Sequence, residues 1–436
     1  MPQPQHSQQP PVQRARQRAV CIASLPTGED FAELRELLRT AGVAVVGEMV
    51  QHNESPHPNT YLGPGKLLEL AAYAEECDAN VIACDDELSP RQERNLEQEL
   101  KLPVVDRTTV ILDIFAAHAG SAEGKLQVEL AQLEYNMARM RGLWTHLERL
   151  GGGIGTRGPG ETQIETDRRL ARNRIAALRR KLAGVQSSRT VMRSERGRAS
   201  LPELALAGYT NTGKSTLLGA LTGASVPVAD RLFHTLDPMT RTLLINGRTY
   251  LATDTVGFIR KLPHQLVDAF ATTLEETRRA ALILHVEDAA VPEDELRAMS
   301  HAVEEVLEEI GAGEQARIRV LNKIDLLDPD ALTRVRNANR DAVLVSAFTG
   351  EGIAELRERI EEEFLRSLRS IDLLVPYADG ARLAELHDIA GELLEREDTP
   401  EGVRVCVRLP AAVAARFERF AVNGGGAVNG DGAGGR

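Results

Sequence analysis

The strongest chemical signal in the sequence lies at residues 208–216, where glycines, a lysine and hydroxyl side chains follow a fixed spacing. The pattern is Gly, four residues, Gly-Lys and Ser, and with the next residue its members are Gly208, Tyr209, Thr210, Asn211, Thr212, Gly213, Lys214, Ser215 and Thr216. Such glycines let backbone N–H groups wrap around phosphates, and the following helix points its positive end at them. Lys214 is expected to reach the β and γ phosphates, and Ser215 to give its hydroxyl to Mg²⁺. The spacing predicts a nucleoside triphosphate site; the alternative is a chance glycine turn between a strand and a helix.

A second phosphate-side motif consists of Asp254, Thr255, Val256 and Gly257, directly after a strand-like run at residues 250–253. Asp254, at the end of that strand, can hold a magnesium-bound water. Gly257 leaves room for its own N–H to meet the γ phosphate. The pattern is common by itself, and it supports a nucleotide site only because it follows the phosphate loop in the sequence.

Base recognition is predicted from two further motifs, each placed after a strand-like run. They are Asn322, Lys323, Ile324 and Asp325, after residues 318–321, and Ser346, Ala347 and Phe348, after residues 343–345. The carboxylate of Asp325 can accept hydrogen bonds from the N1–H and the 2-amino group of guanine, a pattern that adenine does not offer. Because a buried carboxylate left unpaired is costly, discrimination against ATP is expected to be large. With the Ala347 N–H expected to point at guanine O6, the four ordered motifs predict a GTP site.

The segment between the first two motifs is expected to be a mobile switch that supplies a threonine to Mg²⁺. Its residues are Phe233, His234, Thr235, Leu236 and Asp237. Thr235 is the predicted metal ligand and Thr240 is the competing one; a third possibility is that either threonine only decorates a loop. We expect Lys214, Thr235, Asp254 and Gly257 to take part directly in hydrolysis.

Two positions bear on the rate and the cofactors of this reaction. Phe258 follows Gly257, where Ras-like proteins carry the glutamine that orients the attacking water, and an apolar ring has no group for that task. Intrinsic hydrolysis is therefore expected to be slow, with the water positioned by a backbone group, another side chain or a bound partner. Asn211 stands where potassium-activated GTPases have a ligand for K⁺. An Asn selected for an awkward turn is the alternative, and both remain open.

The elements that position these motifs follow from alternating apolar and amphipathic runs, which predict an α/β fold. Strands are expected near residues 19–25, 43–50, 81–84, 103–105 and 403–409, and helices near 31–41, 66–76 and 381–395. Another helix is expected to begin at Ser89, with Pro90 and Gln92 placed for a capping box. The predicted parts are a disordered tail at 1–18, an N-terminal α/β domain at 19–120, a helical hairpin at 121–185, a basic linker at 186–200, a G domain at 201–365, a C-terminal α+β appendix at 366–422 and a flexible tail at 423–436.

The hairpin is predicted from two apolar seams with helical spacing. They are Leu126, Leu130, Leu133, Met137 and Met140, then Ala171, Ile175, Leu178 and Leu182, joined by a glycine-rich segment at 151–160. Arginines crowd this region, and the candidates for RNA contact are Arg157, Arg168, Arg169, Arg172 and Arg174. Arginine pairs with phosphate bidentately, and glycines let a backbone come close. The alternatives are a solvated helix face and a simple linker.

Composition limits the function further. The chain has 436 residues, enough for about two to four domains, and a net charge of -12 argues against indiscriminate coating of nucleic acid. Its four cysteines lie far apart without a CxxC pair, which argues against a zinc site or a disulfide framework and fits a reducing cytoplasm. Residues 1–18 lack the apolar run of a signal peptide, and no later run reaches the length of a membrane span. We expect a cytoplasmic monomer.

With these motifs the chain resembles the HflX family of ribosome-associated GTPases. The resemblance rests on the nucleotide motifs, on the run at residues 151–169 and on Tyr-Leu-Gly-Pro-Gly-Lys at residues 61–66. It implies a P-loop GTPase domain of the α/β class, preceded by a small α/β subdomain and an antiparallel helical hairpin. It also implies binding to the large ribosomal subunit and its rRNA, with the hairpin loop reaching towards the peptidyl-transferase centre, and GTP-dependent splitting or rescue of stalled ribosomes. His234 departs from the small residue usual in that family.

Two other functions use the same nucleotide site. A GTPase that powers another RNA-directed process, such as tRNA modification or ribosome assembly, would need a catalytic cysteine or a cofactor site elsewhere, and the four cysteines have no such setting. A nucleotide-binding scaffold without activity is disfavoured by the intact Lys214, Ser215, Thr235 and Asp254. Residues 63–66, with two glycines and a lysine, could bind a separate nucleotide, although a capped helix start is the favoured interpretation.

Overall fold

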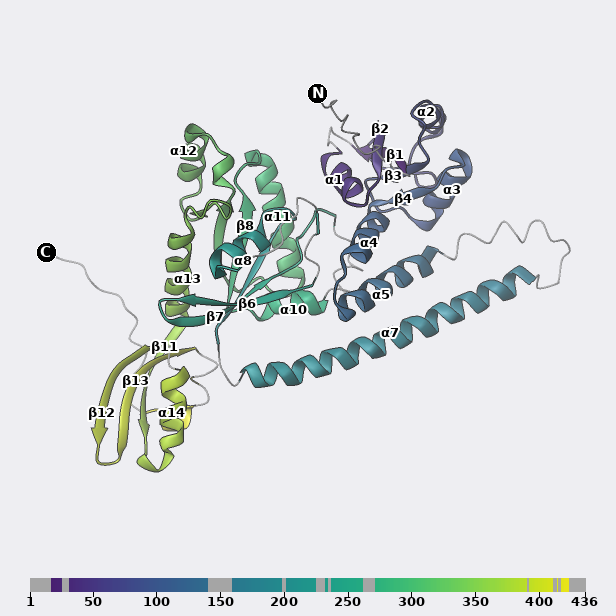
Figure 1. The fold of residues 1–436 in the computed structure, drawn as a ribbon. Coiled ribbons are helices and arrows are strands. Elements are labelled where there is room, and N and C mark those ends of the chain that lie inside the picture. The colour runs from purple at the N-terminus through teal and green to yellow at the C-terminus, as the bar shows by residue number, and fades with distance from the viewer. Residues whose placement is uncertain are drawn as a thin grey trace, which may run out of the picture.

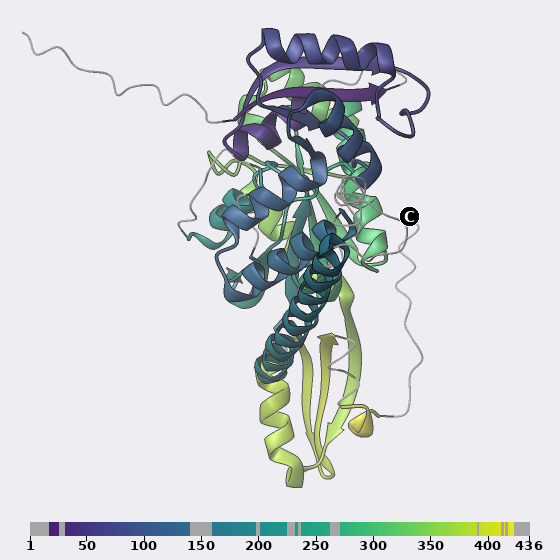
Figure 2. The same cartoon turned by 90° about the vertical axis from the view of Figure 1, so that its right-hand side faces the viewer.

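The computed structural model describes residues 17–25, 31–139, 159–197, 201–224, 232–233, 237–261, 271–389, 392–410, 414 and 417–422. These residues form sheets of four, six and three strands, and Figure 2 shows the N-terminal and C-terminal sheets at opposite ends of the molecule. The α/β fold class predicted from the sequence is confirmed. In this described part of the chain, no helix is both long and apolar enough to cross a membrane.

The N-terminal sheet is wholly parallel, with the strand order β2-β1-β3-β4. Its elements are β1 (Arg18–Leu25), α1 (Ala32–Thr40), β2 (Ala44–His52), α2 (Pro64–Glu76), β3 (Val81–Cys84), α3 (Pro90–Leu100), β4 (Val104–Asp106) and α4 (Arg107–His118). The predicted capping box is present, because the Ser89 hydroxyl accepts the Gln92 N–H and the Gln92 side chain accepts the Ser89 N–H. The carboxyl ends of β3 and β4 carry Asp85 and Arg107, which face the G domain.

The helical hairpin consists of α5 (Ala122–Arg139) and α7 (Pro159–Gly197), and its apolar seam contains the predicted residues apart from Met140, which lies outside the described residues. Leu130 of α5 packs with Ile175, Leu178 and Leu182 of α7. Figure 1 shows α7 as one long helix that extends past α5 at its carboxyl end. The prediction of a linker over 186–200 was wrong for residues 186–197, which are helical. Their polar composition suggested a linker, but they contain no proline and no glycine before Gly197, so nothing ends the helix earlier.

The G domain has a six-stranded sheet in the order β10-β9-β8-β5-β7-β6, in which only β6 runs antiparallel to its neighbour. Its elements are β5 (Glu203–Gly208), α8 (Lys214–Thr222), β6 (Met239–Ile245), β7 (Arg248–Asp254), α10 (Ala271–Arg279), β8 (Leu282–Asp288), α11 (Glu293–Glu309), β9 (Ala316–Asn322), α12 (Pro329–Ala338), β10 (Val343–Leu344) and α13 (Ile353–Ser367). The nucleotide motifs follow β5, β7, β9 and β10. Because parallel strands end at one edge of a sheet, the motifs converge there.

The C-terminal sheet is antiparallel, with the order β11-β13-β12. It is built from β11 (Leu368–Val375), α14 (Gly380–Ile389), β12 (Glu392–Thr399) and β13 (Gly402–Pro410). The prediction of a helix over 381–395 was too long. Residues from Glu392 onward pair with β13, and this pairing gives their backbone groups partners that helical spacing alone did not reveal.

Candidate nucleotide site

The phosphate loop connects β5 to α8, and its glycines are required by neighbouring backbone and side chains. A Cβ at Gly208 would collide with the carbonyl oxygen of Val286, and one at Gly213 would lie 2.5 Å from the Asn322 Nδ2 atom. Gly213 also has a φ of 86°, in the left-handed region that glycine adopts without strain. Asn211 has a φ of 61°, which asparagine tolerates better than most residues. This supports the turn interpretation of Asn211, while its potassium role stays a prediction.

Lys214 begins α8 and is buried, with 6% of its surface exposed. Its Nζ donates to the carbonyl oxygens of Gly208 (3.0 Å) and Tyr209 (2.7 Å). Burial lowers the pKa of the Lys214 amine to about 8, and the nearby Asp254 carboxylate acts in the opposite direction. A triphosphate placed at this loop would favour the charged amine, so nucleotide binding and protonation of Lys214 are coupled.

The affinity for GTP is expected to be constant below about pH 7 and to fall as the pH rises through 8, by up to about tenfold per pH unit. The reason is that the bound triphosphate requires the protonated amine, which the free protein loses near pH 8. Titration with a fluorescent GTP analogue between pH 6.5 and 9.5 measures this slope.

Lys214→Arg is the matched control, because its guanidinium stays charged over the whole range and the slope is expected to vanish. The stability of the nucleotide-free protein is expected to change with pH in the opposite direction to the GTP affinity. Its free energy of unfolding rises from pH 8 to 10.5, since the unfolded chain binds more protons in that range. A slope unchanged in Lys214→Arg would contradict the assignment to this amine.

Oxygen donors suited to Mg²⁺ lie beside Lys214. The Ser215 hydroxyl donates to the Asp254 Oδ2 at 2.5 Å, and Asp254 is 1% exposed at the end of β7. Thr255 holds the following turn, because its hydroxyl donates to the Leu206 carbonyl at 2.7 Å. A hydroxyl and a carboxylate at a strand end are the hard oxygen ligands that Mg²⁺ prefers, directly or through water. The donor set therefore fits the predicted metal.

The second phosphate-side motif lies against the phosphate loop through a backbone bridge. The Thr210 N–H donates to the Phe258 carbonyl at 2.8 Å, and the Phe258 N–H donates to the Gly208 carbonyl at 3.1 Å. A Cβ at Gly257 would lie 2.8 Å from the Thr210 Cα and 3.0 Å from the Lys214 Nζ. Only glycine fits at position 257. The Phe258 ring is 1% exposed and belongs to the core, so it offers no group to the attacking water.

The base-side motifs are joined to the phosphate loop by Asn322. Its Nδ2 donates to the Thr212 carbonyl at 2.8 Å, and its Oδ1 accepts the Ala347 N–H at 2.9 Å. The Ser346 hydroxyl donates to the Asp325 Oδ1 at 2.6 Å, which orients that carboxylate. The structure thus gives the Ala347 N–H a partner that was not predicted, and its contact with guanine O6 stays a prediction.

Of the switch residues, Phe233 and Asp237 are described, whereas His234, Thr235 and Leu236 lie outside the described residues. The competing threonine, Thr240, lies in β6, where its hydroxyl is 3.0 Å from that of Thr253. This pairing favours Thr235 as the metal ligand. The carboxylate of Asp237 is bonded to residues before α5 rather than to the phosphate loop.

The chain is similar to known proteins over most of its length. Family models match residues 28–116 (GTP-binding GTPase N-terminal), 118–196 (GTP-binding GTPase Middle Region) and 203–323 (50S ribosome-binding GTPase). The protein named GTPase HflX of Caldanaerobacter subterraneus subsp. tengcongensis is 44% identical over 94% of this chain and 95% of its own length. GTPase HflX of Escherichia coli is 45% identical over 88% of this chain and 90% of its own length. The chain belongs to the GTPase HflX family.

The family assignment makes this protein a GTP-binding enzyme that hydrolyses GTP. A crystal structure of a GTP-binding protein from Sulfolobus solfataricus in complex with GDP is 27% identical and covers 80% of this chain and 98% of that chain. Its TM-score is 0.41, so the assignment comes from the sequence relatives.

Several contacts around the nucleotide site of this HflX-family GTPase were not predicted from the sequence, and neither were the residues Glu33, Asp85 and Arg107 that make them. Tyr209, the second residue of the phosphate loop, donates its hydroxyl to Glu33 of α1 and accepts the Arg260 N–H at 2.7 Å. The Arg107 guanidinium, 2% exposed, pairs with Glu33 (2.5 Å) and Asp85 (2.8 Å) and donates to the Arg260 carbonyl at 3.1 Å. The N-terminal domain therefore contacts both the phosphate loop and the segment after Phe258.

A second ionic contact involves the residue-61 motif that carried part of the resemblance. Lys261 Nζ lies 2.7 Å from Asp86 Oδ1 and 3.4 Å from Asp85 Oδ2. The Tyr61 hydroxyl donates to the Asp86 Oδ2 at 2.5 Å and so orients that carboxylate. Burial raises the pKa of Asp85, while its neighbour Arg107 acts to lower it. Such partners come from distant parts of the chain, and no local pattern indicates them.

A further missed residue lies on the base side. The carboxylate of Asp288, at the end of β8, pairs with the Lys323 Nζ at 2.6 Å. Lys323 has a φ of 67°, and the ion pair joins its side chain to the end of β8. The sequence signal was present, because Asp288 ends an apolar strand on the same sheet edge.

Arg107→Met is expected to destabilise the protein by about 3 kcal/mol, because Glu33 and Asp85 lose their nearest cation and keep only Arg260 and Lys261, each at 3.4 Å. Urea denaturation measures the loss. Arg359→Met removes an ion pair with Glu362 in which the arginine side chain is 42% exposed, and the urea midpoint is expected to stay unchanged. Equal losses of stability in the two variants would show that the buried cluster around Arg107 contributes no more than an exposed ion pair.

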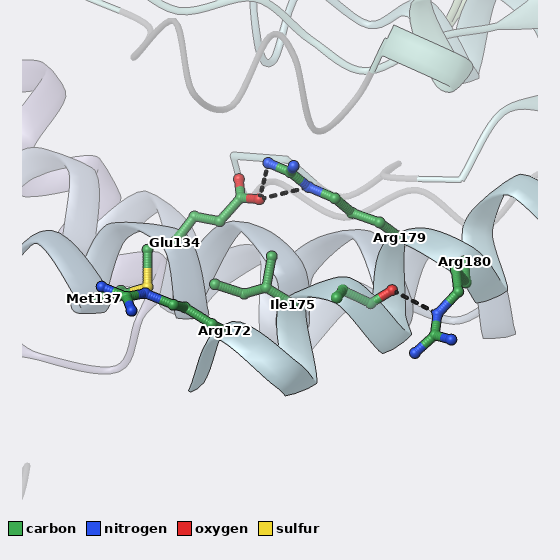
Figure 3. Close-up of a pocket in the computed structure, with 7 residues that line it drawn as sticks. Glu134, Met137, Arg172, Ile175, Arg179 and Arg180 are labelled. Carbon is green, nitrogen blue, oxygen red and sulfur yellow. Dashed lines mark hydrogen bonds and ion pairs between the residues drawn. The ribbon is translucent and has the colours of Figure 1, made fainter. Parts of the chain in front are cut away.

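Of the candidate RNA-contact residues, Arg168, Arg169, Arg172 and Arg174 lie on α7, and Figure 3 shows Arg172. A groove of about 620 Å³ between α5 and α7 is lined by Glu134, Met137, Arg172, Ile175, Ala176, Arg179 and Arg180. Arg169 and Arg172 are exposed and Arg168 is half-buried, whereas Arg157 lies outside the described residues. Arg174 pairs with Glu129 at 2.5 Å, so part of its charge is already neutralised. The prediction for Arg174 is therefore weaker than for Arg169 and Arg172.

Proposed function

We propose that this HflX-family GTPase binds the large ribosomal subunit and its rRNA in the GTP state and leaves it after hydrolysis. Such a cycle would split or rescue stalled ribosomes or assist subunit recycling in the cytoplasm. The observation that carries the proposal is the hairpin, which presents exposed arginines on a long helix that leads into the G domain. The family model over residues 203–323, described as a 50S ribosome-binding GTPase, supports the same partner.

The assignment of roles within the nucleotide site is part of the proposal. Lys214 and the phosphate-loop amides hold the β and γ phosphates, and the Gly257 N–H holds the γ phosphate from the other side. Ser215 and Thr235 would hold Mg²⁺, with Asp254 binding a water of the ion. When bound, Mg²⁺ neutralises charge on the phosphates as the bond breaks. Asp325, Ser346 and Ala347 select guanine, and Asn322 keeps the base and phosphate sides in register.

The buried Phe258 gives the partner a role in hydrolysis. No water-orienting side chain follows Gly257, so intrinsic turnover is expected to be slow and to be stimulated by the ribosome. Binding of GTP then acts as a timer, because the complex persists until the partner completes the hydrolytic site.

Sedimentation of ribosomes through sucrose gradients tests the proposal. The full chain is expected to migrate with large subunits in the presence of a non-hydrolysable GTP analogue, and not with GDP. A double variant, Arg169→Ala with Arg172→Ala, is expected to weaken this migration without changing GTP binding. No migration in any nucleotide state would refute the ribosomal role.

A further inference from the structure

Asp237 lies outside the phosphate loop and binds the two residues that precede the hairpin helix α5. Its Oδ2 accepts the N–H groups of Gly120 (3.1 Å) and Ser121 (2.7 Å), and its Oδ1 accepts the Ser121 hydroxyl. The Ser121 Oγ accepts the Gly124 N–H at 2.8 Å. The first N–H groups of a helix have no partner within the helix, and a carboxylate is favoured there. Ser121 is thus the N-cap of α5, and Asp237 of the G domain fixes Ser121 in place.

Two glycines leave the space that this carboxylate occupies. A Cβ at Gly124 would lie 2.6 Å from Asp237 Oδ1, and one at Gly120 would lie 3.2 Å from Oδ2. Gly184, in the other hairpin helix, has nothing within 4 Å of such a Cβ. We call Gly120, Ser121 and Gly124 the α5 socket. An added methyl group at position 124 would displace the carboxylate.

The other flank of the switch segment is held at the same junction of α4 and α5. Phe233 is 3% exposed, and its ring meets Phe115 of α4 edge to face, with centroids 4.6 Å apart and planes at 81°. Phe233 has a φ of 56°, a conformation that costs free energy for a residue with a bulky side chain. Packing against Phe115 maintains it. Both described flanks of the switch therefore rest on residues that precede the G domain.

The α5 socket is also connected to the metal side of the nucleotide site. In the register of β6 with β7, Met239 is opposite Asp254. Asp237 is two residues before Met239, and two extended residues span at most about 7 Å. A shift of Asp237 is thus transmitted over a short distance to the strand end that carries Asp254.

We propose that Asp237 is a positioning residue for GTP hydrolysis that acts through the α5 socket. The socket holds the end of the switch segment in the GTP state, so that the segment is presented to the metal side and α5 responds to the nucleotide. This rests on the metal role proposed above for the switch threonine. Coupling between two sites is reciprocal. If GTP stabilises the hydrogen bonds of Asp237 in the α5 socket more than GDP does, these bonds raise the affinity for GTP over that for GDP by the same factor.

Amide hydrogen exchange in the full chain tests this, read on residues 119–125 with GDP or with a non-hydrolysable GTP analogue. Saturation is confirmed separately with a fluorescent nucleotide. In the unmodified protein the analogue is expected to slow exchange at Gly120 and Ser121 relative to GDP. Asp237→Ala and Gly124→Ala are expected to abolish this difference, whereas Gly184→Ala, the matched methyl addition, is expected to keep it.

Kinetics supply a second readout that a purely structural role would not change. Asp237→Ala is expected to lower kcat for GTP about fivefold, because the switch segment loses its hydrogen bonds to the α5 socket, with a smaller change in KM. Asp237→Asn is expected to restore part of kcat, because its side-chain oxygen can still accept one N–H.

Each contrary result identifies what has failed. Equal exchange with both nucleotides, when both are bound, would overturn the α5 socket proposal and leave the GTPase assignment intact. Failure to bind GTP would contradict the nucleotide site itself. If Asp237→Ala folds poorly, Gly124→Ala decides, and an unchanged exchange difference and kcat in that variant would overturn the proposal.

Discussion

Asp325→Asn is expected to lower the affinity for GTP by about a hundredfold to a thousandfold and to create affinity for xanthosine triphosphate. The carboxylate of Asp325 accepts the N1–H and the 2-amino group of guanine in the proposed complex. An asparagine amide presents one acceptor and one donor instead, so the 2-amino group meets a donor. Xanthine has a carbonyl oxygen at that position, and the amide can donate to it.

Asp325 is held for this task, because its Oδ1 accepts the Ser346 hydroxyl at 2.6 Å. Competition of GTP, ATP and xanthosine triphosphate against a fluorescent guanine nucleotide measures the change. Asp328→Asn is the matched control. Asp328 caps α12 by accepting the Ala331 N–H at 2.7 Å, and asparagine caps helices equally well. Unchanged GTP affinity in Asp325→Asn would remove this residue from the base site.

Lys214→Met is expected to reduce kcat for GTP by about a hundredfold to a thousandfold, the usual effect of removing one donor that stabilises a developing anion. The nucleotide-free protein is expected to become more stable, because a desolvated amine is replaced by an apolar side chain of similar length. Loss of activity together with gain of stability distinguishes a functional residue from a structural one.

Phosphate release under multiple-turnover conditions and thermal denaturation measure the two effects of Lys214→Met. Lys66→Met is the control, since Lys66 also follows a glycine in a short motif but pairs with Glu69 at 2.9 Å on the surface of α2. Its GTP hydrolysis is expected to be unchanged. A loss of hydrolysis in Lys66→Met would revive the idea of a second nucleotide site in the N-terminal domain.

The sequence alone predicted which motifs lie around the nucleotide site. Residues 208–216 and Asp254 with Gly257 are local patterns, because each needs only a strand that ends in a turn and the correct side chains within a few positions. Parallel strands carry their ends to one edge, so the order of motifs implied their convergence. The seam of the hairpin could also be predicted, since the apolar residues of each helix recur at helical spacing, for example Leu126 and Leu130 in α5 and Ile175 and Leu178 in α7.

Only the tertiary structure could reveal what surrounds that site. Three contacts join residues far apart in the sequence: Tyr209 with Glu33, the buried Arg107 with Glu33 and Asp85, and Asp237 with Ser121 before α5. Such contacts depend on how the domains pack against one another, and no periodicity in a single sequence indicates that packing. The length of α7 was misjudged for a related reason: an exposed helix and a linker have the same polar composition, and only the absence of a helix-ending residue separates them. Local spacing therefore determined which nucleotide is bound, and domain packing decided which residues hold the switch segment.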